Sequence, residues 1–152
     1  MTAMKWKNSI FAKGYRFLKY CKYKPLCFVA LLYSAYYRLG ILLLKPARLQ
    51  KHWGIRGEES PEEETTETYR YAYRVSYAVD RICNRTAWES KCLVRALTAQ
   101  TLLKKKGIHS TLYLGCAVEE GKMVAHAWLR CGKMYVTGGD GSKYAMVDKY
   151  YS

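Results

Sequence analysis

Two residues of this chain are of the types that a thiol-dependent acyl-transfer reaction needs. Cys92 lies at the start of a helical pattern, and His126 lies inside an apolar, strand-like run. A cysteine at a positive helix end is favoured as the thiolate, and a histidine on a neighbouring rigid strand can act as its general base. The pattern therefore predicts a cysteine protease or another acyl-transfer enzyme.

The first turn of that helix could stabilise both a thiolate and a reaction intermediate. Lys91 precedes Cys92, and the unbonded N–H groups at a helix N-terminus also favour an anion. The same groups could bind the oxyanion of a tetrahedral intermediate. Each residue also has a structural alternative, because free cysteines are often buried and a single histidine is often a hydrogen-bonded core residue.

The secondary-structure elements must bring these two residues together. Helices are predicted over residues 5–24, 26–44, 60–83 and 90–104. Ser60-Pro61-Glu62-Glu63 is typical of an N-cap, a first-turn proline and a capping box, so we expect the third helix to begin there. Three lysines followed by Gly107 are a helix stop signal.

Beyond Gly107 the pattern becomes that of short strands, which we predict over residues 109–118, 123–131, 133–137 and 144–147. Alternation along the second strand places His126 and Trp128 on one face of the sheet and Ala127 and Leu129 on the other. Helices followed by an antiparallel meander indicate the α+β class. We expect N-terminal helices packed on a small antiparallel sheet.

The composition is that of a folded and strongly basic protein. Half of the residues are hydrophobic, and the formal net charge is +14. Residues 1–57 carry 12 Lys and Arg and no acid, whereas residues 58–67 carry six Glu. A basic segment indicates an acidic peptide, an anionic membrane or a nucleic acid as partner. No nucleic-acid-binding motif is present, so we expect no nucleic-acid partner.

The six cysteines lack the spacing of zinc or redox motifs, and no secretory signal is recognisable. We therefore expect a reduced, cytoplasmic protein without a metal or another cofactor. Residues 27–44 are mostly apolar but contain Arg38, which is costly near the middle of a membrane span. We expect a buried or membrane-surface helix there, and peripheral contact with the membrane stays open.

Several ordered motifs together resemble one enzyme family. They are Cys-Leu-Val-Arg-Ala-Leu at 92–97, Leu-Tyr-Leu-Gly at 112–115, Ala-His-Ala-Trp-Leu at 125–129 and Val-Thr-Gly-Gly at 136–139. The set resembles the leader peptidases of lasso-peptide biosynthesis, in the standalone form of the microcin-J25-type processing protein, within the transglutaminase-like superfamily. The resemblance covers residues 60–140 well and the helical amino-terminal region loosely.

The resemblance implies a papain-like or transglutaminase-like cysteine protease core over residues 58–152. A basic, helical region over residues 1–57 would contact a partner or the membrane surface. The implied activity is removal of the leader from a ribosomally made precursor peptide. A small leader-recognition protein would deliver the leader, and a separate ATP-dependent lasso cyclase would then close the ring.

Carried onto this chain, the resemblance makes Cys92 the nucleophile and His126 the base that later protonates the leaving amine. Trp88, Arg95 and Trp128 receive supporting roles toward the substrate or the oxyanion. Arg95 lies one turn after Cys92, where it could pair with a carboxylate of the site or face solvent.

The family also places an acidic residue on the strand after the histidine, to orient the imidazole. If residues 132–133 form a two-residue hairpin turn, His126 lies opposite Gly139, and Asp140 lies one residue further along. Asp140 would then be close but on the wrong face, unless a bulge redirects it. The alternatives are Asp140 as the third catalytic residue and a Cys–His dyad oriented by a backbone carbonyl or by Thr137.

Two readings from different functional classes therefore remain. One is a leader peptidase that depends on Cys92 and His126. The other is a non-catalytic scaffold of the same fold that binds a peptide or a membrane surface. The order of the cysteine and the histidine favours the first, and the lack of a clearly placed acid favours the second.

Overall fold

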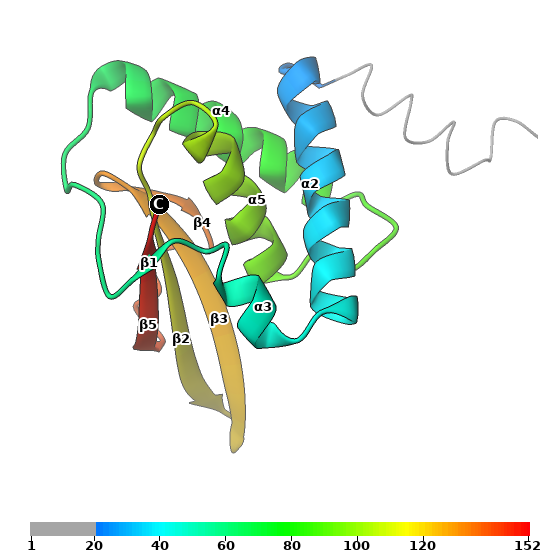
Figure 1. Cartoon of the computed structure of the whole chain (residues 1–152), viewed down its shortest axis with the longest axis vertical. Coiled ribbons are helices and arrows are strands. Elements are labelled where there is room, and N and C mark those ends of the chain that lie inside the picture. Colours follow the sequence, from blue (N-terminus) through cyan, green and yellow to red (C-terminus); the bar gives the residue numbers. More distant parts are fainter. Residues whose placement is uncertain (1–20) are drawn as a thin grey trace, which may run out of the picture.

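Two helices pack on a five-stranded antiparallel sheet, and a third helix packs against those two (Figure 1). The computed structural model describes residues 21–152, so most of the helix predicted over residues 5–24 lies outside the described residues. The helices are α2 (Lys24–Leu43), α3 (Pro46–Gln50), α4 (Thr66–Cys83) and α5 (Cys92–Lys104). The strands are β1 (Ile55–Arg56), β2 (Thr111–Glu119), β3 (Lys122–Cys131), β4 (Met134–Thr137) and β5 (Ala145–Tyr151).

The central helix is α5, which contacts α2 and α4 as well as the sheet. Most of its apolar side chains are buried, and the hydroxyl of Thr98 is satisfied within the helix by the carbonyl of Val94 at 2.7 Å. One hydrophobic core joins α2, α4 and α5 to the sheet, so it extends to both sides of the domain boundary expected at residue 57. The predicted α+β class, with helices packed on a small antiparallel sheet, is confirmed.

The structure corrects the predicted start of the third helix. α4 begins at Thr66, and the side chain of its N-cap, Thr65, accepts a hydrogen bond from the backbone N–H of Thr68. The cap predicted at Ser60 is wrong, because the N–H and the hydroxyl of Ser60 both bond the Thr111 hydroxyl, at 2.7 and 2.9 Å. A residue held against the sheet in this way cannot cap a helix.

The strand order β1-β5-β2-β3-β4 also departs from the predicted meander. The meander is correct for β2, β3 and β4, but β5 pairs with β2 instead of β4 and is longer than predicted. Alternation predicts a strand but not which sheet edge it joins. The connection from β4 to β5 therefore has to cross past β3 and β2, over the end of the sheet where the candidate histidine lies.

α2 confirms the helix predicted over residues 26–44. Within residues 21–152, α2 is the one helix that is long and apolar enough to cross a membrane, with a mean hydropathy of 1.7. Its inner side contacts α4 and α5, and Arg38 forms an ion pair with Glu89 at 3.2 Å. Membrane contact by its exposed residues, which include Phe28, Leu32 and Leu39, stays a prediction.

The cysteines fall into three groups. Cys21 and Cys27 form a disulfide, so the expectation of a fully reduced chain is wrong for this pair. Cys83 and Cys131 are free and buried, and burial raises the pKa of both thiols, that of Cys131 to about 11. Cys92 and Cys116 are free and half-buried. Within residues 21–152, no cluster of His, Cys, Asp and Glu side chains is arranged to hold a metal ion.

Candidate active site

Cys92 is the first residue of α5. Lys91 is the N-cap, and its side chain makes no capping hydrogen bond. The backbone N–H groups of the first turn therefore have no side-chain acceptor. Together with the helix dipole they favour an anion at this point, which could be the thiolate or an oxyanion.

Arg95 fixes the segment that leads into Cys92. Its Nε donates to the carbonyl of Ser90 at 3.0 Å, and its other nitrogens bond Asp80 at 3.2 Å and Asn84 at 2.6 Å. Arg95 thus pairs with a carboxylate, but this carboxylate belongs to α4 and not to the candidate catalytic residues. We regard Arg95 as a positioning residue that ties the first turn of α5 to the end of α4.

Trp88 precedes Cys92 by four residues in the chain and carries an unbonded donor. Its indole N–H is shielded from solvent and has no hydrogen-bond partner within the described residues. Buried donors of this kind are rare because each one costs free energy. The neighbouring Glu89 forms ion pairs with Lys91 at 3.1 Å and with Arg38 of α2. These pairs hold the segment between α4 and α5 in place, and neither of them involves the indole N–H of Trp88.

His126 on β3 is oriented by a backbone carbonyl. Its Nε2 lies 2.7 Å from the carbonyl oxygen of Gly138. A carbonyl can only accept, so Nε2 carries the proton and Nδ1 is the unprotonated nitrogen of the neutral ring. Gly138 has a φ of +78°, and a Cβ on it would lie 2.5 Å from the carbonyl oxygen of Ala127. Only glycine fits where this carbonyl must lie.

Aromatic rings pack on the imidazole. His126 stacks on Tyr144, with 4.5 Å between ring centroids, and on Trp128, with 6.0 Å. Trp128 stacks in turn on Tyr113 at 5.5 Å. A Cβ on Gly141 would lie 2.4 Å from the Trp128 ring, so the loop after β4 lies directly against the indole. Trp128 therefore supports the imidazole by packing.

The two candidate residues lie on elements that contact each other, because α5 packs on β3. Within the described chain, however, no hydrogen bond joins the Cys92 thiol to the His126 ring. Ala127 and Leu129 belong to the core that α5 covers, so alternation places His126 on the other face. Since β4 pairs with β3 only from Leu129 onward, His126 lies where β3 is not paired with β4. A thiol on α5 would have to pass around this edge of β3 to contact the imidazole.

The carboxylate of Asp140 contacts a different residue from the one predicted. It accepts a hydrogen bond from the backbone N–H of Ser142 at 3.0 Å, which holds the pKa of Asp140 below its usual range. Thr137, the other alternative, has a buried hydroxyl without a partner among residues 21–152. Of the ways considered to orient His126, the structure forms the backbone-carbonyl contact, and a catalytic role for Asp140 stays a prediction.

Several residues of the site were missed by the sequence reading. The sequence pattern predicts Tyr144 in a strand, but it lies in the crossing loop and stacks on the imidazole. Asp80 and Asn84, which hold Arg95, are separated from it by more than ten residues and carry no local signal. The repeated glycines of residues 138–141 were a usable signal, because each marks a backbone position open to a positive φ.

Comparison with known protein families matches residues 40–149 to the transglutaminase-like superfamily. Comparisons with curated proteins and with solved structures found no match. The matched range includes the helix that begins with Cys92 and the strand that carries His126. It spans well over half of the chain, and the superfamily includes cysteine peptidases. This chain belongs to the transglutaminase-like superfamily.

Proposed function

We propose that the protein is a cysteine peptidase that removes the leader from a lasso-peptide precursor. One observation carries the proposal: Cys92 begins a helix with uncapped N–H groups, and the neighbouring strand carries a histidine whose Nε2 is bonded to a carbonyl. This hydrogen bond leaves Nδ1 as the base. A thiol at a positive helix end and an oriented imidazole are the two groups that the reaction requires.

In the proposed reaction, Nδ1 of His126 takes the thiol proton of Cys92. The sulfur attacks the carbonyl carbon of the scissile peptide bond and forms a tetrahedral oxyanion. When the C–N bond breaks, the imidazolium gives its proton to the leaving amine, which becomes the free amino terminus of the core peptide. Water then attacks the thioester, so that the leader leaves as a carboxylic acid and the thiol is restored.

Two sets of donors are available for the oxyanion. The first is the uncapped turn of α5, beginning with the N–H of Cys92 itself. We assign the second to the indole N–H of Trp88, four residues before Cys92 in the chain, which has no hydrogen-bond partner among the described residues. Donors directed at developing charge in a water-poor site are typically worth about 3–4 kcal/mol each.

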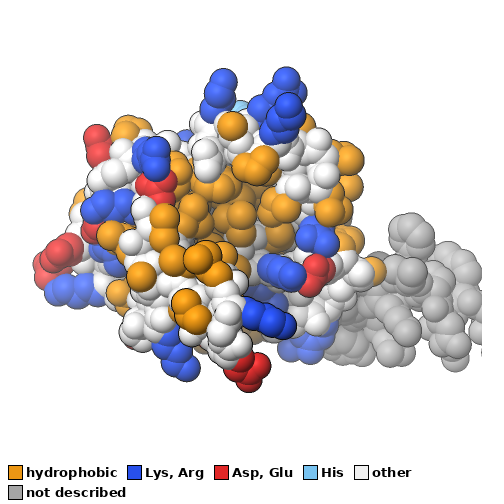
Figure 2. Space-filling model, turned by 90° about the horizontal axis from the view of Figure 1, so that it is seen from below, with side chains coloured by type: hydrophobic (Ala, Val, Ile, Leu, Met, Phe, Trp, Pro, Cys, Tyr) orange, Lys and Arg blue, Asp and Glu red, His pale blue; other side chains and the backbone are white. Residues whose placement is uncertain are grey.

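The partners in this proposal are the precursor peptide, a small leader-recognition protein that delivers it, and a lasso cyclase that uses the exposed amino terminus. We place the reaction in the cytoplasm, with peripheral membrane contact as an option for α2. Figure 2 views the lower end of Figure 1 and shows hydrophobic side chains gathered in a hollow, with Lys and Arg side chains around its rim. Such a surface suits a peptide that carries apolar and acidic residues.

The alternative is a non-catalytic scaffold that binds a peptide or a membrane surface. One observation favours it: within residues 21–152 the Cys92 thiol is not hydrogen-bonded to His126. The lack of this hydrogen bond is compatible with catalysis, because catalytic hydrogen bonds are often long before substrate binds. The position of His126 on the sheet face away from α5 also favours the scaffold, and thiol labelling decides between the two functions.

Thiol labelling tests the proposal directly. With iodoacetamide at pH 6.5, Cys92 should react at least about tenfold faster than Cys116, because only Cys92 lies at the N-terminus of a helix, where the nucleophilic form of a thiol is favoured. Cys83 and Cys131 should react more slowly still, since burial raises the pKa of both. Peptide mapping by mass spectrometry measures all four rates in one sample.

Cys116 is the matched control, because it is the other free, half-buried cysteine of the described chain. His126→Gln should slow the labelling of Cys92 and leave that of Cys116 unchanged. Equal rates for Cys92 and Cys116 in the wild-type protein would favour the scaffold.

Substitution of Asp140 tests whether its carboxylate or the Gly138 carbonyl orients the imidazole of His126. We expect Asp140→Asn to lower kcat/KM for precursor cleavage less than about tenfold, because Asn keeps an acceptor for Ser142 and the Gly138 carbonyl orients His126. A carboxylate that does orient the catalytic histidine is worth about 10⁴-fold in kcat. A loss of that size, with unchanged unfolding, would make Asp140 the third catalytic residue.

A further inference from the structure

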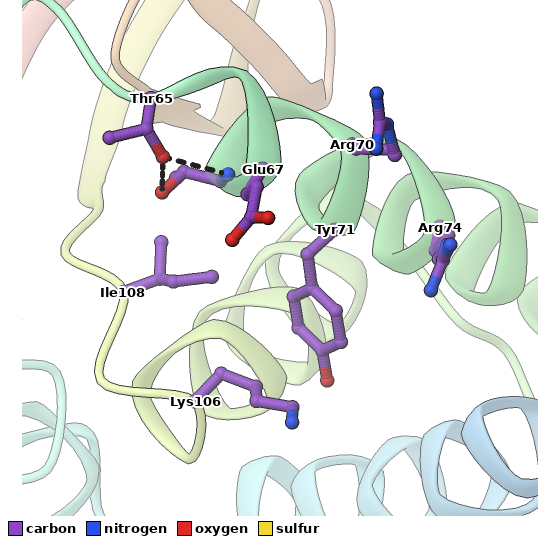
Figure 3. Close-up of a pocket in the computed structure, with 8 residues that line it drawn as sticks. Thr65, Glu67, Arg70, Tyr71, Arg74, Lys106 and Ile108 are labelled. Carbon is purple, nitrogen blue, oxygen red and sulfur yellow. Dashed lines mark hydrogen bonds between the residues drawn. The ribbon is translucent and has the colours of Figure 1, made fainter.

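Two adjoining cavities form one groove at the end of α5 that is remote from Cys92. One has a volume of about 390 Å³ and lies between the start of α4 and the loop after α5, and the other, of about 560 Å³, continues toward α2. They share Tyr71, Arg74 and Lys106, so we treat them as a single surface, the basic groove. Figure 3 shows Arg70 and Arg74 on successive turns of α4, with Tyr71 and Lys106 below them.

The basic groove has an excess of unpaired positive charge. Its cations are Lys22, Arg70, Arg74, Lys105 and Lys106, and its single carboxylate is Glu67. In the described chain none of these cations forms an ion pair, although seven other ion pairs are present. Aromatic rings instead hold several of them in place.

These ring contacts position the cations before any partner binds. The Lys106 ammonium lies 5.7 Å from the centroid of Tyr71, and Arg74 and Lys22 lie 5.5 and 5.4 Å from that of Tyr23. Such contacts restrict a long side chain without neutralising its charge. The groove therefore presents ordered cations that lack a counter-ion within residues 21–152.

Local structure accounts for only part of this charge. Lysines at the C-terminus of α5 are favoured by the helix dipole. The dipole does not explain Arg70 and Arg74, which lie within α4, or Lys22, which precedes α2. The first 20 residues of the chain carry five Lys and Arg and no acid, so they would add to the positive charge and not offset it.

The shape and lining of the groove select among anions. Its cations are spread along two connected cavities and do not converge on one point, which suits an extended chain better than a single phosphate. Apolar side chains line the same cavity as Lys22, Arg74, Lys105 and Lys106, and they are those of Pro25, Leu26, Val29 and Leu102. A peptide with alternating acidic and apolar side chains would satisfy both features.

We propose that the basic groove is a docking site for a segment of the leader-recognition protein, the partner that delivers the precursor. This segment would carry both acidic and apolar side chains. Its role in delivery rests on the proposed peptidase function. Cys92 begins α5 and the groove lies past the end of that helix, about 20 Å away along the axis at 1.5 Å per residue. Recognition at the groove is therefore spatially separate from chemistry at the thiol.

Fluorescence anisotropy with a labelled peptide that repeats Glu-Leu-Gly tests the docking site without requiring peptidase activity. We expect the wild-type protein to bind it, and the triple variant Arg70→Gln, Arg74→Gln, Lys106→Gln to bind about tenfold more weakly, since each exposed pair contributes about two- to threefold. The matched control, Arg48→Gln, Lys51→Gln, Lys122→Gln, removes the same charge from residues that do not line the groove and should bind within about twofold of wild type.

Equal weakening in the two triple variants would overturn the proposal, because it would show attraction to net charge alone. So would tighter groove-dependent binding of oligothymidylate or of phosphatidylserine vesicles than of the acidic peptide. With delivered precursor, the groove variant should raise KM and leave kcat and the labelling rate of Cys92 unchanged. A protein that binds the peptide through the groove but cleaves no precursor would refute the peptidase function and leave the docking site in place.

Discussion

Replacing Cys92 with alanine is expected to lower the rate of precursor cleavage by at least about a thousandfold, because removal of a catalytic nucleophile leaves only the contributions of binding and oxyanion stabilisation. The fold should persist. Cys92 is only half-buried and begins a helix, so alanine should change the free energy of unfolding by less than about 1 kcal/mol. Cleavage is measured by mass spectrometry of the released leader, and stability by urea unfolding.

His126→Gln gives an independent test of the same prediction. The Gln amide can keep a donor toward Gly138, but it cannot accept the thiol proton, so the rate should fall by a similar factor. Residues that act as one unit are strongly non-additive, so the double variant should be no slower than the slower single variant. Cys116→Ala is the control and should cleave at the wild-type rate. Cleavage by Cys92→Ala at more than a tenth of that rate would contradict the prediction.

Features that depend on nearby residues were predictable from the sequence. Cys92 could be placed in a first helical turn because the start and stop signals of α5 lie within its own segment. The faces of β3 followed from alternation alone: Ala127 and Leu129 are in the core, and His126 stacks with Trp128. Both inferences use periods of a few residues, which the backbone geometry imposes wherever the chain forms that element.

Features that depend on pairing between distant segments were not predictable in this way. Ser60 has a complete capping signal, yet its polar groups are bonded to Thr111, 51 residues away in the chain. The register near the hairpin was predicted correctly, with Arg130 opposite Tyr135, but it shifts before Leu129 pairs with Thr137. Val136 is the extra residue at this shift, two positions before Gly138, whose carbonyl contacts the imidazole.

Arg130 is the clearest example of a residue whose contacts with distant segments could not be predicted from the sequence. Its substitution is also expected to have the second large effect, which is on stability. Alternation marked it only as one more strand residue, yet it is 8% exposed and joins the sheet to the segment before α4. Its guanidinium donates to the Tyr113 hydroxyl at 2.9 Å, to the Gly132 carbonyl at 2.8 Å, and to the Ser60 carbonyl and the Glu59 carboxylate at 3.1 Å each.

Arg130→Met is therefore expected to lower the free energy of unfolding by about 2–4 kcal/mol, because methionine fills similar space but leaves these acceptors without their donor. The urea midpoint at pH 7 measures the effect. Lys133→Met is the matched control, since it removes an exposed ion pair with Glu63 and should cost less than about 1 kcal/mol. Equal midpoints for the two variants would refute a structural role for Arg130.

Acidification should narrow the difference in the free energy of unfolding between wild type and Arg130→Met. A hydrogen bond from Lys149, with help from Arg130, holds the pKa of Glu59 below its usual range. For a carboxyl whose folded pKa is lowered, the stabilisation is complete above the unfolded value and is lost as the pH falls through the folded value. Below that pH Glu59 is protonated and no longer forms an ion pair with the guanidinium. Arg130→Met therefore lowers the free energy of unfolding by less than it does at pH 7. A difference that stayed constant from pH 7 to pH 3 would assign the whole effect to the neutral acceptors, the hydroxyl of Tyr113 and the carbonyls of Ser60 and Gly132.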